Sequence, residues 1–434
     1  MNYLKQIWFD MRHQKMMTWV AVSGTAVSVF LVMVMFMVNN LKTVGFAPDY
    51  NRDRIYTAQR MTVKSTDENI MWSNGGRMSY KTVMQLFGDL DGVELLSVCG
   101  GGTSETDLIV KDKNPLSVSM KSVDGNYWKM FDFRFLRGRA FTEDECLGEK
   151  NLAVIAESVA RKVFSSIDVV GRTINLEGTD FEVTGVVADV NPILQNAWAG
   201  VYTSLSDKQR KSGWSRGKML GSCMALMLYR EDVDPEKIRR EVESRYATLN
   251  ETMKDNRMMV EYEGAPFSAE EVYITDQEEG RPDLKKEHQR EYLLYLILLL
   301  LPAINLSSMM RGRLQHRISE LGVRRAFGAR RRDIIRQLFG ENLVVTLIGG
   351  GIGLVLSYLF MMTLSSEFFI FVADDYGLTL ENKIATPSFG MLFTWDAFFV
   401  AVGACLVLNL LTATVPAWRA SIINPAVAIA KSKN

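Results

Sequence analysis

Residues 18–38 read TWVAVSGTAVSVFLVMVMFMV, an apolar run without a charged side chain. Three similar runs follow at 292–310 (YLLYLILLLLPAINLSSMM), 343–364 (LVVTLIGGGIGLVLSYLFMMTL) and 397–417 (AFFVAVGACLVLNLLTATVPA). A helix needs about 20 consecutive apolar residues to cross a bilayer, so each run is long enough to do so. The sequence therefore predicts a membrane protein with four transmembrane helices, arranged as one plus three.

The N-terminus has two features of its own. A signal peptide is one interpretation of the first run, since basic residues precede it, but its apolar core exceeds the usual length of about 7–15 residues and no A-x-A cleavage site follows. We expect the run to be retained. Apolar residues at positions 4, 7, 8 and 11 have helical spacing, which predicts an amphipathic helix on the inner membrane surface over residues 1–17. A frayed basic tail is the alternative.

Basic residues in the short loops set the orientation. The loop after the second run is rich in arginine, whereas the loop between the third and fourth runs carries mainly acidic residues; both chain ends are basic. We therefore expect cytoplasmic N and C termini, and an extracytoplasmic location for the long segment between the first two runs.

That long segment, 39–291, can bury a core of its own. Apolar or alternating runs predict strands at 151–156, 173–176, 181–187 and 224–229, and a helix is predicted at 234–249 with Asp234 as N-cap and Pro235 at its first position. The mixture without a regular βαβ rhythm indicates an α+β domain. Its polar end, DLKKEHQR at 283–290, leads directly into the second apolar run, which suggests a helical stalk.

Catalytic and metal-binding patterns do not emerge from the sequence. It holds three histidines and no HExxH or GxSxG motif. We interpret the acidic run 143–145 as a solvated loop and the triple glycine 100–102 as a flexible turn. Equal numbers of basic and acidic residues, 50 each, argue against nucleic acid as a partner. Cys99, Cys146 and Cys223 are interpreted as small buried residues, with one disulfide among them left open.

The most informative stretch is RISELGVRRAFGARRRDIIR at 317–336. A helix, a glycine break and a second helix would present a short rigid knob to a cytosolic partner, with apolar contacts from Leu321, Val323 and Phe327. The arginines would pair with carboxylates of the partner or with lipid phosphates. The simpler interpretation is a loop that sets topology and touches anionic lipid, which the charge pattern alone favours.

This stretch resembles the MacB/FtsX permease family, in which E-x-G-x-R-R-A-x-G-A precedes a glycine-rich third span. PAWRASIINPAVAIA at 416–430 is similar to the C-terminal motif of that family. FRFLRGRAFTEDE at 133–145, LAVIAESVARKVF at 152–164, VGRTINLEG at 170–178 and FEVTGVVADV at 181–190 resemble its periplasmic core domain.

The resemblance implies a permease subunit that transmits mechanical motion from a cytosolic ABC ATPase to the periplasmic domain. It assigns the ATPase-coupling role to residues of the knob: Glu320, Leu321, Gly322, Arg324, Arg325, Ala326, Phe327, Gly328 and Ala329. The printed sequence has no G-x-x-x-x-G-K-[ST] phosphate loop, so we expect no enzymatic activity and no bound cofactor, with ATP and Mg on the partner ATPase.

The chain is thus expected to divide in order into an amphipathic helix (1–17), a first span (18–38), a periplasmic α+β domain with stalk (39–291), a second span (292–310), a cytoplasmic coupling loop (311–342), a third span (343–364), a short extracytoplasmic loop (365–396), a fourth span (397–417) and a cytoplasmic tail (418–434).

Small residues in the third span are expected to permit close helix packing rather than to contact substrate: Gly349, Gly350, Gly351 and Gly353. The spans contain no ionisable side chain beyond tyrosine and cysteine, which argues against a proton- or ion-coupled carrier.

The expected function is efflux or export of an amphipathic substrate, such as a peptide, drug or lipoprotein, by a permease of the bacterial inner membrane. The alternative is an FtsX-like signalling protein that controls cell-envelope enzymes. Expected partners are the ATPase, a second permease copy or paralogue forming a dimer, membrane lipid and, for efflux, a membrane-fusion protein.

Overall fold

The structure is a computed structural model that describes residues 15–43, 45–67, 69–100, 103–111, 113–148, 150–192, 194–214, 218–274, 280–298, 300, 330–374, 395, 398–400, 402–404 and 406–407. These residues fall into two compact units. One contains the described residues within 15–40, 285–365 and 395–407, and the other contains those within 41–284 and 366–374. Each unit is described by itself.

Two helices of the first unit have the length and composition of membrane spans. Helix α2 (Lys15–Thr43) contains the apolar stretch Thr18–Asn40, and helix α11 (Arg331–Asp374) contains Phe339–Thr363. The first and third predicted spans are therefore present as helices. The second and fourth lie partly outside the described residues, so the count of four spans stays a prediction.

Both long helices exceed the predicted spans. Helix α11 starts inside the segment assigned to the cytoplasmic loop and continues ten residues beyond the predicted span end at Leu364. Hydropathy locates the part of a helix that fits a bilayer, whereas the helix itself ends only where its backbone hydrogen bonds end; no proline interrupts residues 331–374. A further helix covers 284–298, across the boundary between the polar stretch and the second apolar run.

The second unit contains a seven-stranded sheet. Its order is β7 (Phe135–Gly138), β10 (Thr179–Val187), β8 (Leu152–Ala156), β11 (Val201–Ser204), β6 (Leu116–Val123), β5 (Ser104–Ile109) and β9 (Thr173–Leu176). Because β9 also pairs with β10, six of the strands close into a ring. Helix α6 (Glu157–Phe164) contributes Val159, Ala160 and Val163 to its core.

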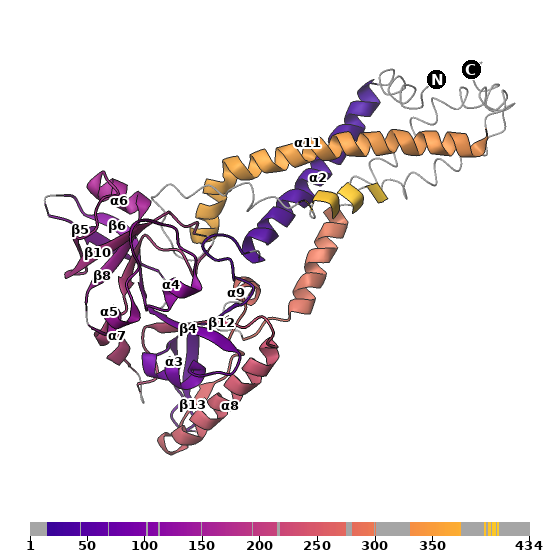
Figure 1. Cartoon of the computed structure of the whole chain (residues 1–434). Helices are drawn as coiled ribbons and strands as arrows, with labels where there is room; N and C mark the ends of the chain where they lie inside the picture. The colour runs from indigo at the N-terminus through magenta and orange to yellow at the C-terminus, as the bar shows by residue number, and fades with distance from the viewer. Residues whose placement is uncertain are drawn as a thin grey trace. The chain divides into compact units, whose positions relative to one another are not determined.

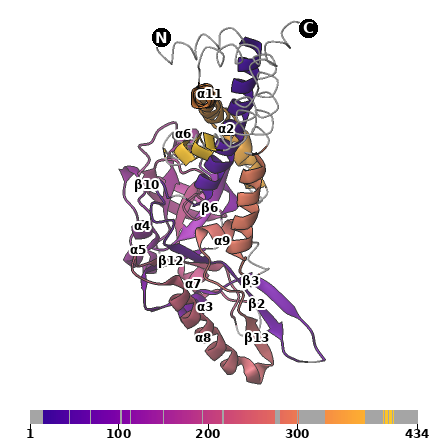
Figure 2. The same cartoon turned by 90° about the vertical axis from the view of Figure 1, so that its right-hand side faces the viewer.

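A second core lies around two three-stranded sheets. The first has the order β1 (Ile55–Ala58), β12 (Cys223–Tyr229) and β4 (Val93–Gly100); the second has the order β13 (Met258–Glu261), β2 (Arg60–Ser65) and β3 (Ser73–Arg77). Helices α3 (Tyr80–Phe87) and α8 (Pro235–Met253) pack against these strands, as Figure 1 shows. In Figure 2, β2 and β3 form a hairpin that extends away from the rest of this unit.

Short helices complete the unit: α4 (Tyr127–Met130), α5 (Glu143–Leu147), α7 (Asp207–Lys211), the 3-10 turn η1 (Lys254–Asn256) and α9 (Ala269–Ile274). Near α4, seven aromatic side chains pack together with ring centroids 4.8 to 6.1 Å apart: Tyr127, Trp128, Phe131, Phe133, Phe135, Phe141 and Tyr202.

The strands and the helix cap predicted from strong local sequence signals are confirmed. Strand β9 has the predicted bounds, and β8, β10 and β12 cover the other three predicted strands. Asp234 caps α8 by accepting a hydrogen bond from the Glu236 N–H at 3.0 Å, with Pro235 at the first helical position.

Two local predictions are wrong. The acidic run is not a loop but helix α5, because Thr142 and Glu145 form a capping box at its start. Gly100 is not in a turn: it ends strand β4, where a Cβ atom would lie 2.9 Å from Cβ of Ser122 on β6 of the seven-stranded sheet. Positions 101 and 102 of the triple glycine lie outside the described residues. Cys99, Cys146 and Cys223 are buried and free, so no disulfide joins them.

Candidate functional site

The predicted coupling segment, Glu320–Ala329, lies outside the described residues. The description resumes at Arg330, directly before α11. The coupling role assigned to this segment stays a prediction. In the part of the chain that is described, no group of His, Cys, Asp and Glu side chains is arranged to hold a metal ion.

Two of the glycines predicted to pack helices lie against α2. A Cβ atom at Gly349 would be 2.8 Å from Cβ of Thr25, and one at Gly353 would be 2.5 Å from the carbonyl oxygen of Ala26. Real Cβ atoms do not approach other heavy atoms this closely, so at these positions only glycine permits the observed spacing of α2 and α11. Phe30 and Phe360 extend the contact edge to face at 5.3 Å.

The other two glycines behave differently. A Cβ atom at Gly350 would contact Val402 at 3.2 Å, whereas one at Gly351 would meet none of the described residues within 4 Å. The contacts at Gly349, Gly350 and Gly353 are those that a packing role requires, and Gly351 shows no such contact with the residues that the structure describes. That these glycines serve helix packing stays a prediction, which substitution of each glycine would test.

The most strongly connected charged group of the second unit is formed by Glu236, Arg239, Glu271 and Arg281, which we name the junction network. Glu271 on α9 is 1% exposed and Arg239 on α8 is 6% exposed. The Arg239 guanidinium donates to Glu271 at 2.5 Å and to Glu236 at 2.7 Å; Arg281 donates to Glu271 at 2.6 Å and to Glu236 at 2.8 Å. Each carboxylate therefore binds both guanidinium groups.

Backbone groups complete the junction network. The N–H of Ser268 donates to Glu271 at 2.7 Å, and Arg239 donates to the carbonyl of Pro266 at 3.1 Å. The hydrogen bond from Arg281 holds the pKa of Glu236 below its ordinary value. Two positive and two negative charges thus neutralise one another, which is the condition under which buried ionic groups are tolerated.

One residue of the junction network lies just before a helix that leads toward the membrane-spanning part of the sequence. Arg281 lies three residues before the helix 284–298, which leads into the second apolar run. Its partner Glu271 is buried in the second unit, as is Arg239, which binds the same carboxylate. Gly264, with φ +94°, would bring a Cβ atom to 2.9 Å from Cβ of Arg281, so this glycine allows the close approach. The network therefore ties Arg281, just before the helix in the sequence, to a buried carboxylate of the second unit.

A second link joins the other end of the domain to α9. Arg52, nine residues beyond the end of α2, is 4% exposed and donates to the Tyr273 hydroxyl at 2.7 Å. Its guanidinium also lies 5.3 Å from the centroid of the Tyr273 ring and 6.0 Å from that of Phe46. The segments that connect the domain to the first and second apolar runs thus both bind to α9.

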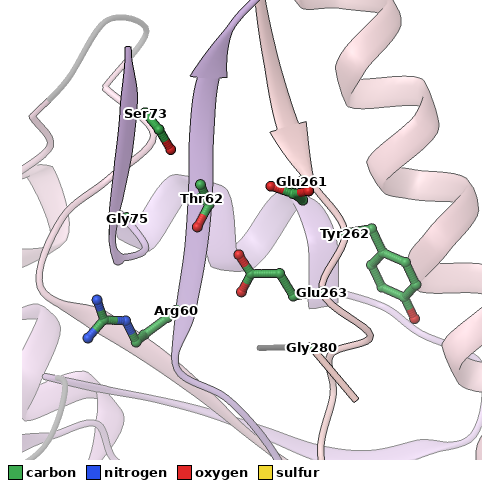
Figure 3. A pocket seen from close by; sticks show the side chains of 8 residues that line it. All are labelled: Arg60, Thr62, Ser73, Gly75, Glu261, Tyr262, Glu263 and Gly280. Atoms are coloured by element: carbon green, nitrogen blue, oxygen red, sulfur yellow. The ribbon is translucent and has the colours of Figure 1, made fainter. Parts of the chain in front are cut away.

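A hollow of about 540 Å³ opens on one face of the sheet β13-β2-β3, lined by Arg60, Thr62, Ser73, Gly75, Glu261, Tyr262, Glu263 and Gly280. Figure 3 shows Thr62, Ser73 and Glu261 on three neighbouring strands. Glu261 pairs with Lys64 at 2.9 Å. The lining is polar and carries both charges, so it suits a polar or zwitterionic group rather than an apolar one.

Reasoning from the sequence did not find the junction network or the hollow. Glu236 and Arg239 have the spacing of a helical ion pair, and that signal was available. Glu271 on the short helix α9 and Arg281 in an irregular segment lie 32 and 42 residues beyond Arg239. No periodicity connects them, because only the tertiary fold brings these segments together.

Comparisons with known proteins agree with the division of the chain. Residues 18–245, just over half of the sequence, match the MacB-like periplasmic core domain, and residues 292–425 match the FtsX-like permease C-terminal domain. The macrolide export ATP-binding/permease protein MacB of Agrobacterium fabrum is 23% identical over 73% of this chain, and that of Escherichia coli K12 is 22% identical over 73%. The ABC transporter permease YknZ of Bacillus subtilis is 21% identical over 77%.

The lengths of these relatives differ. The chain covers 44% of each of these two MacB proteins, less than half of their length, but 76% of YknZ. Among solved structures, the periplasmic region of MacB from Actinobacillus actinomycetemcomitans is 16% identical, with a TM-score of 0.33 over 50% of this chain and 92% of that one. The extracellular domain of YknZ is 13% identical, with a TM-score of 0.33 over 47% and 100%.

The two family matches cover the α+β domain and the apolar C-terminal part in the order that the sequence motifs predict, and the apolar helices α2 and α11 agree with a membrane location. This chain belongs to the MacB/FtsX family of membrane-embedded ABC transporter permeases.

Proposed function

We propose that the chain is the permease subunit of an ABC transporter that couples ATP hydrolysis by a separate ATPase to movement of its extracytoplasmic domain. The observation that carries this proposal is the junction network, in which Arg281, three residues before helix 284–298, binds the buried Glu271 and through it the buried Arg239. A displacement of this helix along its axis would be passed to the domain core instead of being absorbed by a flexible linker.

The route of transmission follows the chain. Motion begins at the predicted coupling segment Glu320–Ala329, passes through the second apolar run and continues through helix 284–298 to Arg281. Glu271 then transfers it to α8 through Arg239. Charged groups held by several hydrogen bonds in a buried site resist displacement, since any movement would leave a charge without its partner.

The separate ATPase is proposed from the sequence and from the names of the relatives. The printed sequence has no phosphate-binding loop, the longer MacB relatives are named ATP-binding/permease proteins, and YknZ, of similar length to this chain, is named a permease. We propose a second permease as a further partner, and an amphipathic peptide, drug or lipoprotein as the cargo.

Co-purification tests this function. The tagged full-length chain is expressed with its chromosomal neighbours and purified in a gentle detergent, and the eluate is assayed for ATPase activity and analysed by mass spectrometry. We expect an ABC ATPase in the eluate of the wild type, and its loss with Arg325→Glu. Lys208→Glu, at an exposed position on α7, is the matched charge reversal and should retain it. A wild-type chain that elutes alone would contradict the proposal.

A further inference from the structure

The sheet β13-β2-β3 has two edges, and one of them is closed at Val260. On the β13 edge, the side-chain amide of Asn250 donates to the carbonyl of Val260 at 2.9 Å and accepts from its N–H at 2.7 Å. A single side chain thus pairs both outward backbone groups, as a neighbouring strand would. Protection of this kind is what prevents an edge strand from pairing with other polypeptides.

The β3 edge is open over Ser73 and Gly75. The register pairs Lys64 with Ser73 and Thr62 with Gly75, and Ser65 donates to Trp72 at 2.9 Å. In an antiparallel pair, hydrogen-bonded residues alternate with residues whose N–H and C=O point away from the partner strand. The backbone groups of Ser73 and Gly75 therefore point outward.

An independent contact confirms this register. Arg77 lies two residues beyond Gly75, so its backbone groups point in the same direction. Its carbonyl oxygen accepts a hydrogen bond from the N–H of Gly221, on the side away from β2. Segment 219–221 covers the edge at Arg77, but within the described part of the chain no hydrogen bond reaches the outward backbone groups of Ser73 or Gly75. Four backbone groups without a hydrogen-bond partner among the described residues are thus presented at the spacing of a strand, about 6.8 Å for two residues.

The side chains leave this edge accessible. The residues are Ser73, Asn74, Gly75 and Gly76, with no lysine, no proline and no bulge among them. Lysines, prolines and bulges are features by which edge strands normally avoid pairing. Their absence here, beside an edge closed by Asn250, indicates an edge built to accept a strand.

The two faces beside β3 differ in chemistry. Gly75 lines the polar hollow, and a Cβ atom there would have only ordinary contacts, 3.6 Å to Thr62 and 3.8 Å to Arg60. Gly76 faces the opposite side, where a Cβ atom would lie 3.2 Å from the indole of Trp214. Trp214 is 52% exposed, so it offers an aromatic surface.

We propose that the open edge of β3 binds an extended amphipathic peptide segment of another polypeptide by strand addition. The backbone of the peptide pairs with Ser73 and Gly75. Alternate side chains then lie on opposite faces, the apolar ones on Trp214 and the polar ones over the hollow seen in Figure 3. Main-chain hydrogen bonds supply affinity, and the contrast between the faces selects alternating sequences.

This inference goes beyond the proposed coupling function and does not depend on it. Binding at β3 requires no ATPase, so a negative result here would leave the transporter proposal unchanged. Equally, a chain that co-purifies with no ATPase could still bind peptide at this edge.

The test uses full-length protein in phosphatidylcholine nanodiscs, with empty nanodiscs as the blank. The probe is a fluorescein-labelled peptide of alternating valine and threonine with one terminal lysine, and binding is read as fluorescence anisotropy. Two comparison probes have the same side chains. In one, the backbone amides along one edge of the extended peptide are N-methylated, and in the other, those along the opposite edge are. Methylation removes donors without changing the side chains, so this comparison needs no variant of the protein.

Variants of the protein locate the site. Gly75→Pro removes the outward N–H without breaking the ladder to β2, and we expect about tenfold weaker binding. Gly75→Ala keeps that N–H and should bind within about twofold of the wild type. Trp214→Ala should weaken binding of this probe but have less effect on a peptide of alternating serine and threonine.

Three results would overturn the proposal. The first is no binding of the unmodified probe by the wild type. The second is equal binding of the two N-methylated probes and the unmodified one. The third is a Gly75→Pro variant that binds like the wild type; if that variant also loses self-association by mass photometry, the edge pairs with a second copy of the chain and not with a peptide.

Discussion

Substitution of Glu271 by glutamine removes the charge at the centre of the junction network. Glu271 is 1% exposed and accepts from Arg239, Arg281 and the N–H of Ser268. Removing one partner of a buried ion pair costs about 3–5 kcal/mol, and glutamine retains one acceptor oxygen, so we expect about 3 kcal/mol. For a domain of this size, that lowers the unfolding midpoint by about 6–12 °C.

The assay is tryptophan fluorescence of purified full-length protein during a temperature ramp. Glu261→Gln is the control: this carboxylate pairs with a single cation, Lys64 at 2.9 Å, and the two side chains are 46% and 35% exposed. Exposed pairs contribute about 0–1 kcal/mol, so the midpoint of the control should fall by no more than about 4 °C. Equal shifts for the two variants would refute the reasoning that burial makes the junction network rigid.

Three further predictions concern other sites. Burial raises the pKa of Asp49 to about 6, so the folded protein holds this proton more tightly than the unfolded chain does. The free energy of unfolding should therefore fall as pH rises from about 4 to 6, and it should fall less steeply in Asp49→Asn. Urea titrations at several pH values measure this dependence. Gly353→Val should lower the thermal midpoint in nanodiscs, since its Cβ would meet the backbone of α2, whereas Gly351→Val should not. Asn250→Ala leaves both outward backbone groups of Val260 unpaired and should cost about 1–3 kcal/mol in urea denaturation.

Local sequence signals predicted individual elements well. The bounds of β9 and the cap of α8 at Asp234 were readable, because turn and capping residues act over three or four positions. The apolar runs likewise located α2 and α11, since hydrophobic length is a property of the sequence alone.

The features that matter for the candidate site are non-local and were not predicted. Glu271 binds Arg239 across 32 residues, and the closure of the seven-stranded sheet depends on β9 pairing with both β5 and β10. Gly100 looked like a turn glycine, yet its small size serves the approach of Ser122 on a neighbouring strand. In each case the deciding contact comes from a segment distant in sequence.

The central claim is that an ATPase moves the segment that joins helix 284–298 to the domain core. Hydrogen–deuterium exchange of the nanodisc complex with its ATPase, nucleotide-free and then trapped with ADP and vanadate, tests it directly. We expect trapping to change amide exchange in peptides from 280–298 in the wild type, and Glu320→Lys to abolish this change. Trapping that alters exchange in the ATPase but leaves 280–298 unchanged in the wild type would contradict the account.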